Sequence, residues 1–222
     1  MMYIPVGRNA VMSKNITSQT LQRLPVYLNY LMSLSETIKS GNISATAIAG
    51  ALGLNNVQVR KDLASISRGG RPRTGYVTAE LISDIESFLG FENRDGVIVA
   101  GIGNFGRAMM CSESFSDYGF DVVCGFDCNQ DIVGTSVNGK PVRHISEMKN
   151  FCLCENIKTG IITVPEKYAQ EVCDIMTDSG IKYILNFASI HLNVPESVNV
   201  HNENISLTLA MLARCNFSEN RS

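Results

Sequence analysis

Long apolar runs and secretion signals are missing from this sequence of 222 residues. No apolar stretch approaches the roughly 18 residues that a membrane span requires, and the N-terminus lacks the extended apolar core of a signal peptide. Hydrophobic residues make up 45% of the chain and charged residues 18%, which is ordinary for a globular protein. We therefore expect a protein that has no membrane partner and stays in the cytoplasm, with a length that suits two domains.

The sequence also lacks cysteines and histidines at the spacing of a metal site. The seven cysteines are odd in number and lie mostly within apolar segments, which fits a reducing compartment. Cys152 and Cys154 form a C-x-C pair, but no second pair lies at zinc spacing and no histidine is near. We expect no metal site, while a thiol switch remains compatible with the sequence.

The charge is unevenly distributed along the chain. The first 90 residues carry nine Lys and Arg against five Asp and Glu, whereas the remainder carries ten against sixteen. A basic front part on an acidic rear part indicates that only the front meets a polyanion.

The front part has the pattern of two short helices about a tight turn. In GNISATAIAGALGLNNVQVRKDLASI, Ser44 is an N-cap candidate, Gly53 ends the first helix, and Asn55 or Asn56 caps a second helix that runs through Ile66. The second helix turns polar and basic residues outward, and the following SRGGRPRTGYV suits a basic hairpin wing. The alternative is a helical bundle with a solvated charged face. The candidate DNA contacts are Ser44, Asn56, Gln58, Arg60, Lys61, Arg68, Arg71 and Arg73.

The rear part begins with GVIVAGIGNFGRAMM, an apolar strand that leads through G-x-G-x-x-G into a helix expected from Arg107. Gly101 permits the tight turn, Gly103 lets the backbone approach a pyrophosphate, and Gly106 allows close helix–strand contact. A second strand, 120–127, ends in Asp127, where a dinucleotide fold places the carboxylate that binds the ribose. NAD(H) is favoured over NADP(H), because this carboxylate repels a 2′-phosphate and no arginine follows it. The alternatives are another nucleotide, such as coenzyme A, or none.

Further strands are expected at 158–165, 182–188 and 197–202, so the rear part reads as a doubly wound parallel sheet of the α/β class. Its ligand would lie at the carboxyl ends of the strands, near Thr163, Pro165, Asn186 and Phe187. The last helix, ISLTLAMLARCNF, is apolar over much of its surface and packs either on its own domain or on a partner subunit. The expected domains are a winged helix (1–90), a dinucleotide-binding domain (91–204) and a C-terminal dimerisation helix (205–222).

No evident acid–base group accompanies the dinucleotide motif. His144, His191 and His201 are scattered, and none has an adjacent carboxylate pair that indicates activation. We therefore expect a protein that binds the dinucleotide without consuming it, and not an enzyme. The rival interpretations are an NAD-dependent oxidoreductase whose front part is a helical dimerisation module, and a DNA-binding protein whose rear part is only a dimer scaffold.

Several segments, in order, resemble the Rex family of redox-sensing transcriptional repressors: ATAIAGALGLNNVQVRKDL, VIVAGIGNFGRAMM, GIITVP and GIKYILNFA. The resemblance implies a homodimer with a winged helix and a Rossmann domain, joined through a swapped C-terminal helix. It implies binding to a palindromic operator that depends on the NADH to NAD+ ratio, with NADH releasing the DNA. Carried over by motif, the nucleotide-binding residues are Gly101, Ile102, Gly103, Asn104, Phe105, Gly106, Asp127, Thr163, Val164 and Pro165, with Asn186 and Phe187 at the strand ends.

The chain departs from the family pattern at three places. Its wing reads SISRGGRPRTGY where typical members resemble F-G-x-x-G-x-R-G-x-G-Y. A tyrosine that responds to the nicotinamide state in the family aligns with Ser112, and its acidic partner aligns with Asn204. These departures lead to the hypothesis of a divergent paralogue whose redox response is weakened or changed.

Overall fold

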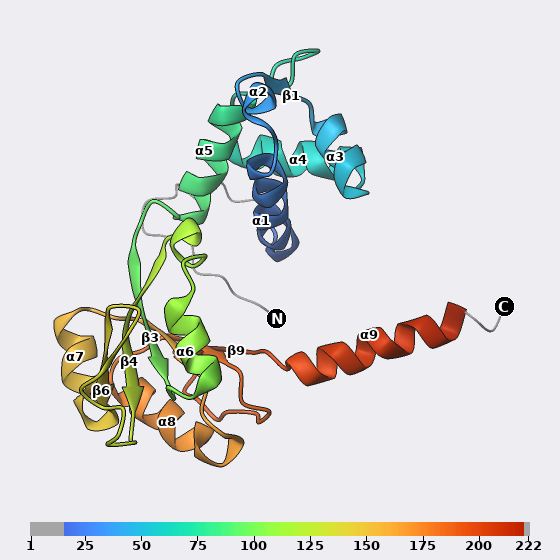
Figure 1. Cartoon of the computed structure of the whole chain (residues 1–222). Helices are drawn as coiled ribbons and strands as arrows, with labels where there is room; N and C mark the ends of the chain where they lie inside the picture. Colours follow the sequence, from blue (N-terminus) through green and yellow to red (C-terminus); the bar gives the residue numbers. More distant parts are fainter. Residues whose placement is uncertain (1–15, 220–222) are drawn as a thin grey trace. The chain divides into compact units, whose positions relative to one another are not determined.

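The computed structural model describes residues 16–219, with side chains described as far as Arg214. The chain divides into two compact units, Met1–Asn93 and Arg94–Ser222 (Figure 1). We call them the N-terminal unit and the C-terminal unit. Parts of the predicted segments 1–90 and 205–222, namely residues 1–15 and 220–222, lie outside the described residues, and the three predicted domain ranges stay predictions.

The N-terminal unit combines helices with a two-stranded sheet. Its helices are α1 (Ser18–Met32), α2 (Glu36–Lys39), α3 (Ala45–Leu52), α4 (Asn56–Ile66) and α5 (Thr78–Leu89). Strand β1 (Asn42–Ile43) pairs antiparallel with β2 (Tyr76–Val77). The hydroxyl of Ser44 accepts a hydrogen bond from the backbone N–H of Ala47, and the left-handed Gly53 ends α3. Asn55, rather than Asn56, caps α4. These caps produce the predicted pair of short helices.

Apolar side chains spaced at three and four along α1 and α4 build one core for this unit. It contains Leu24, Tyr27, Leu28, Leu31, Ile48, Val59, Leu63, Leu81 and Ile85, all fully buried. Pro25 lies inside α1, seven residues after Ser18, where the helix begins.

The C-terminal unit is built on a seven-stranded sheet. Its strands are β3 (Asp95–Ala100), β4 (Phe120–Asp127), β5 (Ser136–Val137), β6 (Lys140–His144), β7 (Thr159–Ile162), β8 (Tyr183–Asn186) and β9 (Asn199–Asn202). They lie in the order β5-β6-β4-β3-β7-β8-β9, and every pair is parallel except β5 with β6. The strand order reverses at β3, so a switch point lies between β3 and β7.

Helices cover both faces of this sheet (Figure 1). Helix α6 (Asn104–Cys111) packs on the face of Val97 and Val99, while α7 (Met148–Cys154) and α8 (Glu166–Asp178) pack on the face of Ile98 and Ala100. The alternation along β3 buries both faces, as expected of a doubly wound sheet. Helix α6 begins at Asn104, three residues before Arg107, where the sequence predicted its start.

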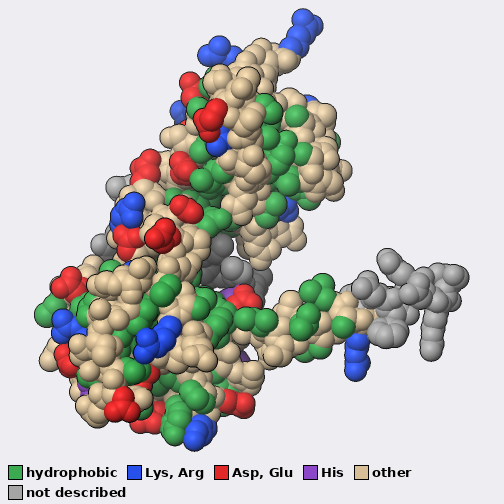
Figure 2. All heavy atoms as spheres, in the orientation of Figure 1, with side chains coloured by type: hydrophobic (Ala, Val, Ile, Leu, Met, Phe, Trp, Pro, Cys, Tyr) green, Lys and Arg blue, Asp and Glu red, His purple; other side chains and the backbone are tan. Residues whose placement is uncertain are grey.

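The last helix, α9 (Ile205–Glu219), carries its apolar residues exposed. Ile205, Leu207, Leu209, Met211 and Leu212 each keep 57–66% of their surface accessible. Figure 2 shows these hydrophobic side chains along the helix. Among the described residues, none of the helices combines the length and apolar character needed to cross a bilayer.

Candidate functional site

The turn between β3 and α6 has a different geometric requirement at each of its three glycines. Gly101 has φ +95°, a conformation that L side chains rarely adopt. A Cβ on Gly106 would collide with the carbonyl oxygen of Gly101, so only glycine lets α6 approach the strand this closely. A Cβ on Gly103 would meet no atom within 4 Å. The surface at Gly103 is therefore open, and the free N–H groups in the first turn of α6 lie beside it.

Asp127 lies at the carboxyl end of β4 and faces this turn. One carboxylate oxygen accepts a hydrogen bond from the backbone N–H of Ile102 at 2.6 Å, and the other accepts from that of Asn129 at 2.9 Å. The side chain is half-buried. Both bonds hold the carboxylate next to the glycine turn, where it can accept hydrogen bonds from a diol.

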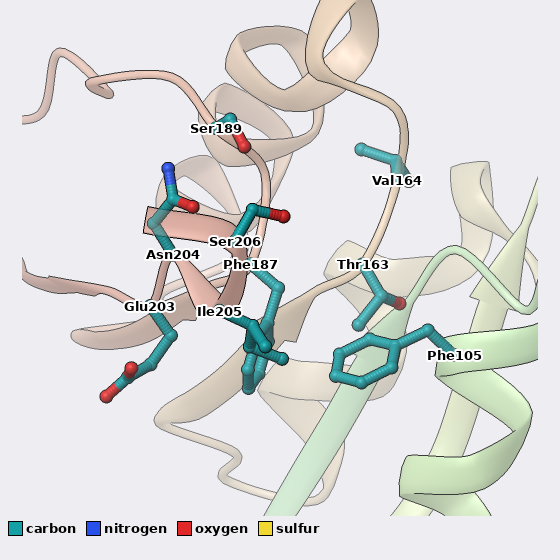
Figure 3. A pocket seen from close by; sticks show the side chains of 9 residues that line it. All are labelled: Phe105, Thr163, Val164, Phe187, Ser189, Glu203, Asn204, Ile205 and Ser206. Carbon is teal, nitrogen blue, oxygen red and sulfur yellow. The ribbon is translucent and has the colours of Figure 1, made fainter. Parts of the chain in front are cut away.

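A pocket of about 280 Å³ lies at the carboxyl ends of the strands (Figure 3). Apart from Phe105 on α6, its residues follow β7, β8 and β9, whereas Asp127 ends β4 on the other side of the switch point. Phe105 and Phe187 meet edge to face across it, with ring centroids 4.8 Å apart. Thr163 donates its hydroxyl hydrogen bonds to the carbonyls of Ala100 and Gly101, at 3.0 and 2.7 Å. The lining residues are Phe105, Thr163, Val164, Phe187, Ser189, Glu203, Asn204, Ile205 and Ser206.

Four of the sequence-predicted nucleotide residues line this pocket, namely Phe105, Thr163, Val164 and Phe187. The lining residues that the prediction missed are Ser189, Glu203, Ile205 and Ser206, which follow β8 and β9. The rule that ligands bind beyond the carboxyl ends of parallel strands would have found them, had it been applied to β9 as well.

Of the four residues predicted near the carboxyl ends of the strands, Pro165 and Asn186 do not line the pocket. Asn186 is fully buried, and its amide donates to the carbonyls of Ala188 and Ile190 and to the side chain of Asn202. It shapes the loop after β8 instead of facing a ligand. Pro165 is exposed and stands immediately before α8.

Ser112 and Asn204, at which the chain departs from the family pattern, each form a hydrogen bond with a residue close in sequence. The Ser112 hydroxyl hydrogen bonds to that of Ser114 at 2.7 Å, and Ser112 is not part of the pocket lining. Asn204 lines the pocket and accepts a hydrogen bond from the backbone N–H of Leu207 at 2.8 Å, which caps α9. Its amide is neutral, so it supplies no charge there.

The basic residues of the N-terminal unit lie on α4 and on the hairpin that follows it. Arg60 and Lys61 are exposed on α4, and the hairpin carries Arg68, Arg71 and Arg73, all exposed. The backbone N–H groups of Arg71 and Gly75 each donate to the other residue's carbonyl, which closes the hairpin, and Arg73 at its tip has φ +68°. Figure 2 shows Lys and Arg side chains at the end of the unit where this hairpin lies. Of the remaining candidates, Ser44 is exposed and Asn56 is half-buried.

A buried carboxylate stands behind this basic surface. Asp62 on α4 is only 3% exposed and accepts hydrogen bonds from Thr20, Arg23 and Tyr27 on α1, and from Gln58. Burial alone would raise the pKa of Asp62, but these hydrogen bonds outweigh it and lower the pKa below its usual value. Gln58, predicted to point outward, is exposed as a residue, yet its amide nitrogen bonds inward to Asp62 at 2.9 Å.

The six cysteines whose side chains the structure describes fall into two environments. Burial raises the pKa of Cys124 to about 12 and those of Cys152 and Cys173 to about 11, so these thiols stay protonated and pack as hydrophobes. Cys152 and Cys154 of the C-x-C pair differ, because Cys152 is in the core and Cys154 is exposed. Residues 16–214 contain no group of three or more His, Cys, Asp or Glu side chains arranged to hold a metal ion.

Two family models match the chain. The model described as "CoA binding domain" matches residues 92–190, and the one described as "Putative DNA-binding protein N-terminus" matches residues 15–64. The first falls on the sheet and the second on the helix pair, so each agrees with the unit on which it lies.

Curated relatives match almost the whole chain. The redox-sensing transcriptional repressor Rex of Porphyromonas gingivalis is 36% identical over 93% of this chain and 94% of its own length. The Rex repressor of Streptomyces coelicolor is 36% identical over 93% of this chain and 80% of its own length. These relatives are named as repressors and not as enzymes, in agreement with the sequence prediction.

Solved structures agree with the sequence relatives. The Rex-family repressor RSP, in complex with NAD+ and operator DNA, superimposes with a TM-score of 0.85 at 29% identity, covering 93% of this chain and 95% of that chain. The same repressor in complex with NADH gives a TM-score of 0.80, covering 92% and 96%. The chain belongs to the Rex family of redox-sensing transcriptional repressors.

Proposed function

We propose that the C-terminal unit of this repressor binds NAD(H) and that the bound nucleotide sets the affinity of the N-terminal unit for operator DNA. The observation that carries the proposal is the open surface at Gly103, where an added Cβ would meet no atom within 4 Å, beside the first turn of α6 and the carboxylate of Asp127. A pyrophosphate and a ribose need these two groups side by side. RSP, a family member, forms complexes with both redox forms and with operator DNA.

The nucleotide would span the switch point. Gly101, Ile102, Gly103 and the first turn of α6 (Asn104, Phe105 and Gly106) would hold the pyrophosphate, and Asp127 the adenosine ribose. The nicotinamide half would then enter the pocket formed by Phe105, Thr163, Val164 and Phe187. Outside the pocket lining, Pro165 would precede α8 and Asn186 would hold the loop after β8. Two aromatic rings at the pocket suit a flat ring ligand.

The N-terminal unit would bind DNA with α4 in the major groove. Gln58, Arg60 and Lys61 would face the groove, Ser44 and Asn56 would lie at the helix starts, and Arg68, Arg71 and Arg73 would contact the backbone from the wing. All but Asn56 are exposed. A palindromic operator would require a two-fold dimer, which the exposed apolar side chains of α9 support by offering a surface for a second copy of this chain. Such a repressor would act in the cytoplasm, beside the chromosome.

We propose further that the redox response is weakened or changed relative to typical members. A hydroxyl at Ser112 and a neutral amide at Asn204 cannot form the tyrosine–acid pair that the family resemblance implies at these positions. In this chain the Ser112 hydroxyl hydrogen bonds to the Ser114 hydroxyl, and Asn204 accepts a hydrogen bond from the backbone N–H of Leu207.

Thermal unfolding with NAD+, NADH, NADP+ and coenzyme A tests the nucleotide, because a ligand that binds only the folded state raises the melting temperature. We expect stabilisation by NAD+ or NADH and none by NADP+. A second candidate ligand is coenzyme A, which the "CoA binding domain" description supports. Stabilisation by coenzyme A alone would favour this ligand over NAD(H). Mobility-shift assays on a selected duplex, with and without the stabilising ligand, then test the coupling to DNA. Release by NADH but not by NAD+ at low concentration would contradict the weakened response.

A further inference from the structure

We propose that Asp62 is a positioning residue that fixes the side-chain amide of Gln58, so that Gln58 presents the hydrogen-bonding edge complementary to adenine. The inference rests on the proposed function, because it assigns a role at the surface of α4 that would enter the major groove. It concerns a residue that touches no DNA and acts through its neighbour.

The geometry around Asp62 leaves its carboxylate fully engaged. One oxygen accepts from Thr20 Oγ1 at 3.0 Å, Arg23 Nη2 at 3.0 Å and Gln58 Nε2 at 2.9 Å. The other accepts from Arg23 Nε at 2.7 Å and Tyr27 Oη at 2.8 Å. Three of these partners come from α1, so the position of the carboxylate is set by the core of the unit and not by the surface.

The amide of Gln58 can meet this carboxylate in one orientation only. An ionised carboxylate accepts hydrogen bonds and donates none, so the amide nitrogen must face Asp62 and the oxygen cannot. The lowered pKa of Asp62 keeps the carboxylate ionised at neutral pH. One N–H donor and the Oε1 acceptor of Gln58 then remain for an outside partner.

That remaining pair matches one base edge. Adenine presents an acceptor, N7, and a donor, the N6 amino group, side by side in the major groove, and a glutamine amide pairs with both. Guanine presents two acceptors there, which this edge cannot satisfy. An amide fixed before binding also avoids part of the entropy loss of ordering a long side chain. We therefore expect one A·T pair in each half-site to be read by Gln58.

The rival account is that Asp62 only joins α4 to α1. Stability measurements cannot separate the two accounts, because both predict that loss of Asp62 destabilises the unit. Base preference separates them, since removal of a different Asp62 partner weakens the network without touching Gln58. Thr20→Ala and Tyr27→Phe are such matched controls, because each deletes one hydrogen bond to Asp62 from α1.

The experiment uses the full chain and a duplex selected by the wild-type protein from a randomised pool, followed by single-base substitutions at each A·T pair. We expect a preference for A·T of roughly 5- to 150-fold at one position per half-site, the range for a good bidentate contact. Gln58→Ala should abolish it. Asp62→Ala should abolish it as well, and the double variant should lose no more than either single variant, because Asp62 acts through Gln58. Thr20→Ala and Tyr27→Phe should keep the preference.

A second variant covers the case in which Asp62→Ala does not fold. Asp62→Asn keeps the shape but offers Gln58 both a donor and an acceptor, so the amide loses its single orientation and the preference should fall toward that of Gln58→Ala. Retained preference in the Asp62 variants, or equal loss in Tyr27→Phe, would overturn the inference and leave the DNA-binding proposal intact. If the wild-type protein selects no duplex, the proposed function itself fails.

Discussion

Gly103 and Gly106 lie three residues apart in one turn, and we expect their alanine variants to fail in opposite ways. A Cβ on Gly106 would collide with the carbonyl oxygen of Gly101 and lie 2.9 Å from Thr163 Oγ1, so α6 must move away from the sheet. Gly103 has φ −72° and ψ −165°, which alanine adopts freely, and its Cβ would meet nothing. Gly106→Ala should therefore damage the fold, and Gly103→Ala only the ligand site.

The sizes of the two effects differ enough to be measured. Inserting a methyl group into a packed contact costs about 1–3 kcal/mol. In a unit of this size each kcal/mol shifts the melting temperature by about 4 °C, so Gly106→Ala should melt about 4–12 °C lower. Nucleotide at about one hundred times its Kd adds about 2.7 kcal/mol, or about 11 °C, to the wild-type protein. Gly103→Ala should melt as the wild type does without nucleotide and gain little with it, because the methyl group occupies the path of the pyrophosphate.

Differential scanning calorimetry with and without NAD+ and NADH measures all three proteins under the same conditions. Gly134→Ala is a control for glycine replacement, because Gly134 also has open space around it and lies outside the site, although its φ of +83° adds local strain. A full nucleotide shift in Gly103→Ala would refute the assignment of the pyrophosphate to this turn. Wild-type stability in Gly106→Ala would refute the packing argument.

Four other changes have defined outcomes. Lys61→Ala should reduce the slope of log K against log salt by about 1 per protomer in a DNA-binding titration. Replacement of the exposed Lys182 in the C-terminal unit should leave this slope unchanged. Burial, with the hydrogen bond to Asp62, raises the pKa of Tyr27 to about 12, so the folded state favours the neutral phenol. The stabilisation of the folded state by the neutral phenol of Tyr27 is complete below pH 10 and is lost as the pH rises toward 12. Relative to Tyr27→Phe, the wild type should lose about 1.4 kcal/mol of unfolding free energy by pH 11, measured by denaturant titration; equal losses would contradict the assignment. Leu209→Glu combined with Met211→Glu should convert dimers to monomers in sedimentation analysis, and an unchanged mass would remove α9 from the interface. Asp127→Ala should weaken NAD(H) binding roughly tenfold or more by calorimetric titration, because charged hydrogen bonds are lost.

The hydrophobic periodicity and the caps predicted most of the fold correctly. The strand 120–127 and the start of α9 at Ile205 agree with the structure to the residue. The start of α6 was placed too late, because Gly106 is a poor helix former and was taken to precede the helix. Its missing side chain is instead what allows the helix to begin at Asn104 against the sheet.

The site was predicted less completely, for two physical reasons. Glu203 and Ser206 lie where β9 gives way to α9 and follow no hydrophobic period, so only the strand order reveals that they reach the pocket. Asp62 was not singled out from the sequence, because an acid next to a lysine is typical of a solvated surface. Its burial depends on donors from α1, some 35 to 42 residues away in sequence, which local patterns do not disclose.

Each unit of the chain closes its own hydrophobic core, with Leu28 and Leu63 in one and Ile98 and Phe126 in another. A ligand that binds the C-terminal unit therefore stabilises the N-terminal unit only to the extent that the folding of the two units is energetically coupled. The rise in the melting temperature of the N-terminal unit upon nucleotide binding is then a direct measure of that coupling free energy. By reciprocity, operator DNA must change the nucleotide affinity by the same factor by which nucleotide changes the affinity for operator DNA, so this second coupling can be determined from nucleotide binding without a promoter.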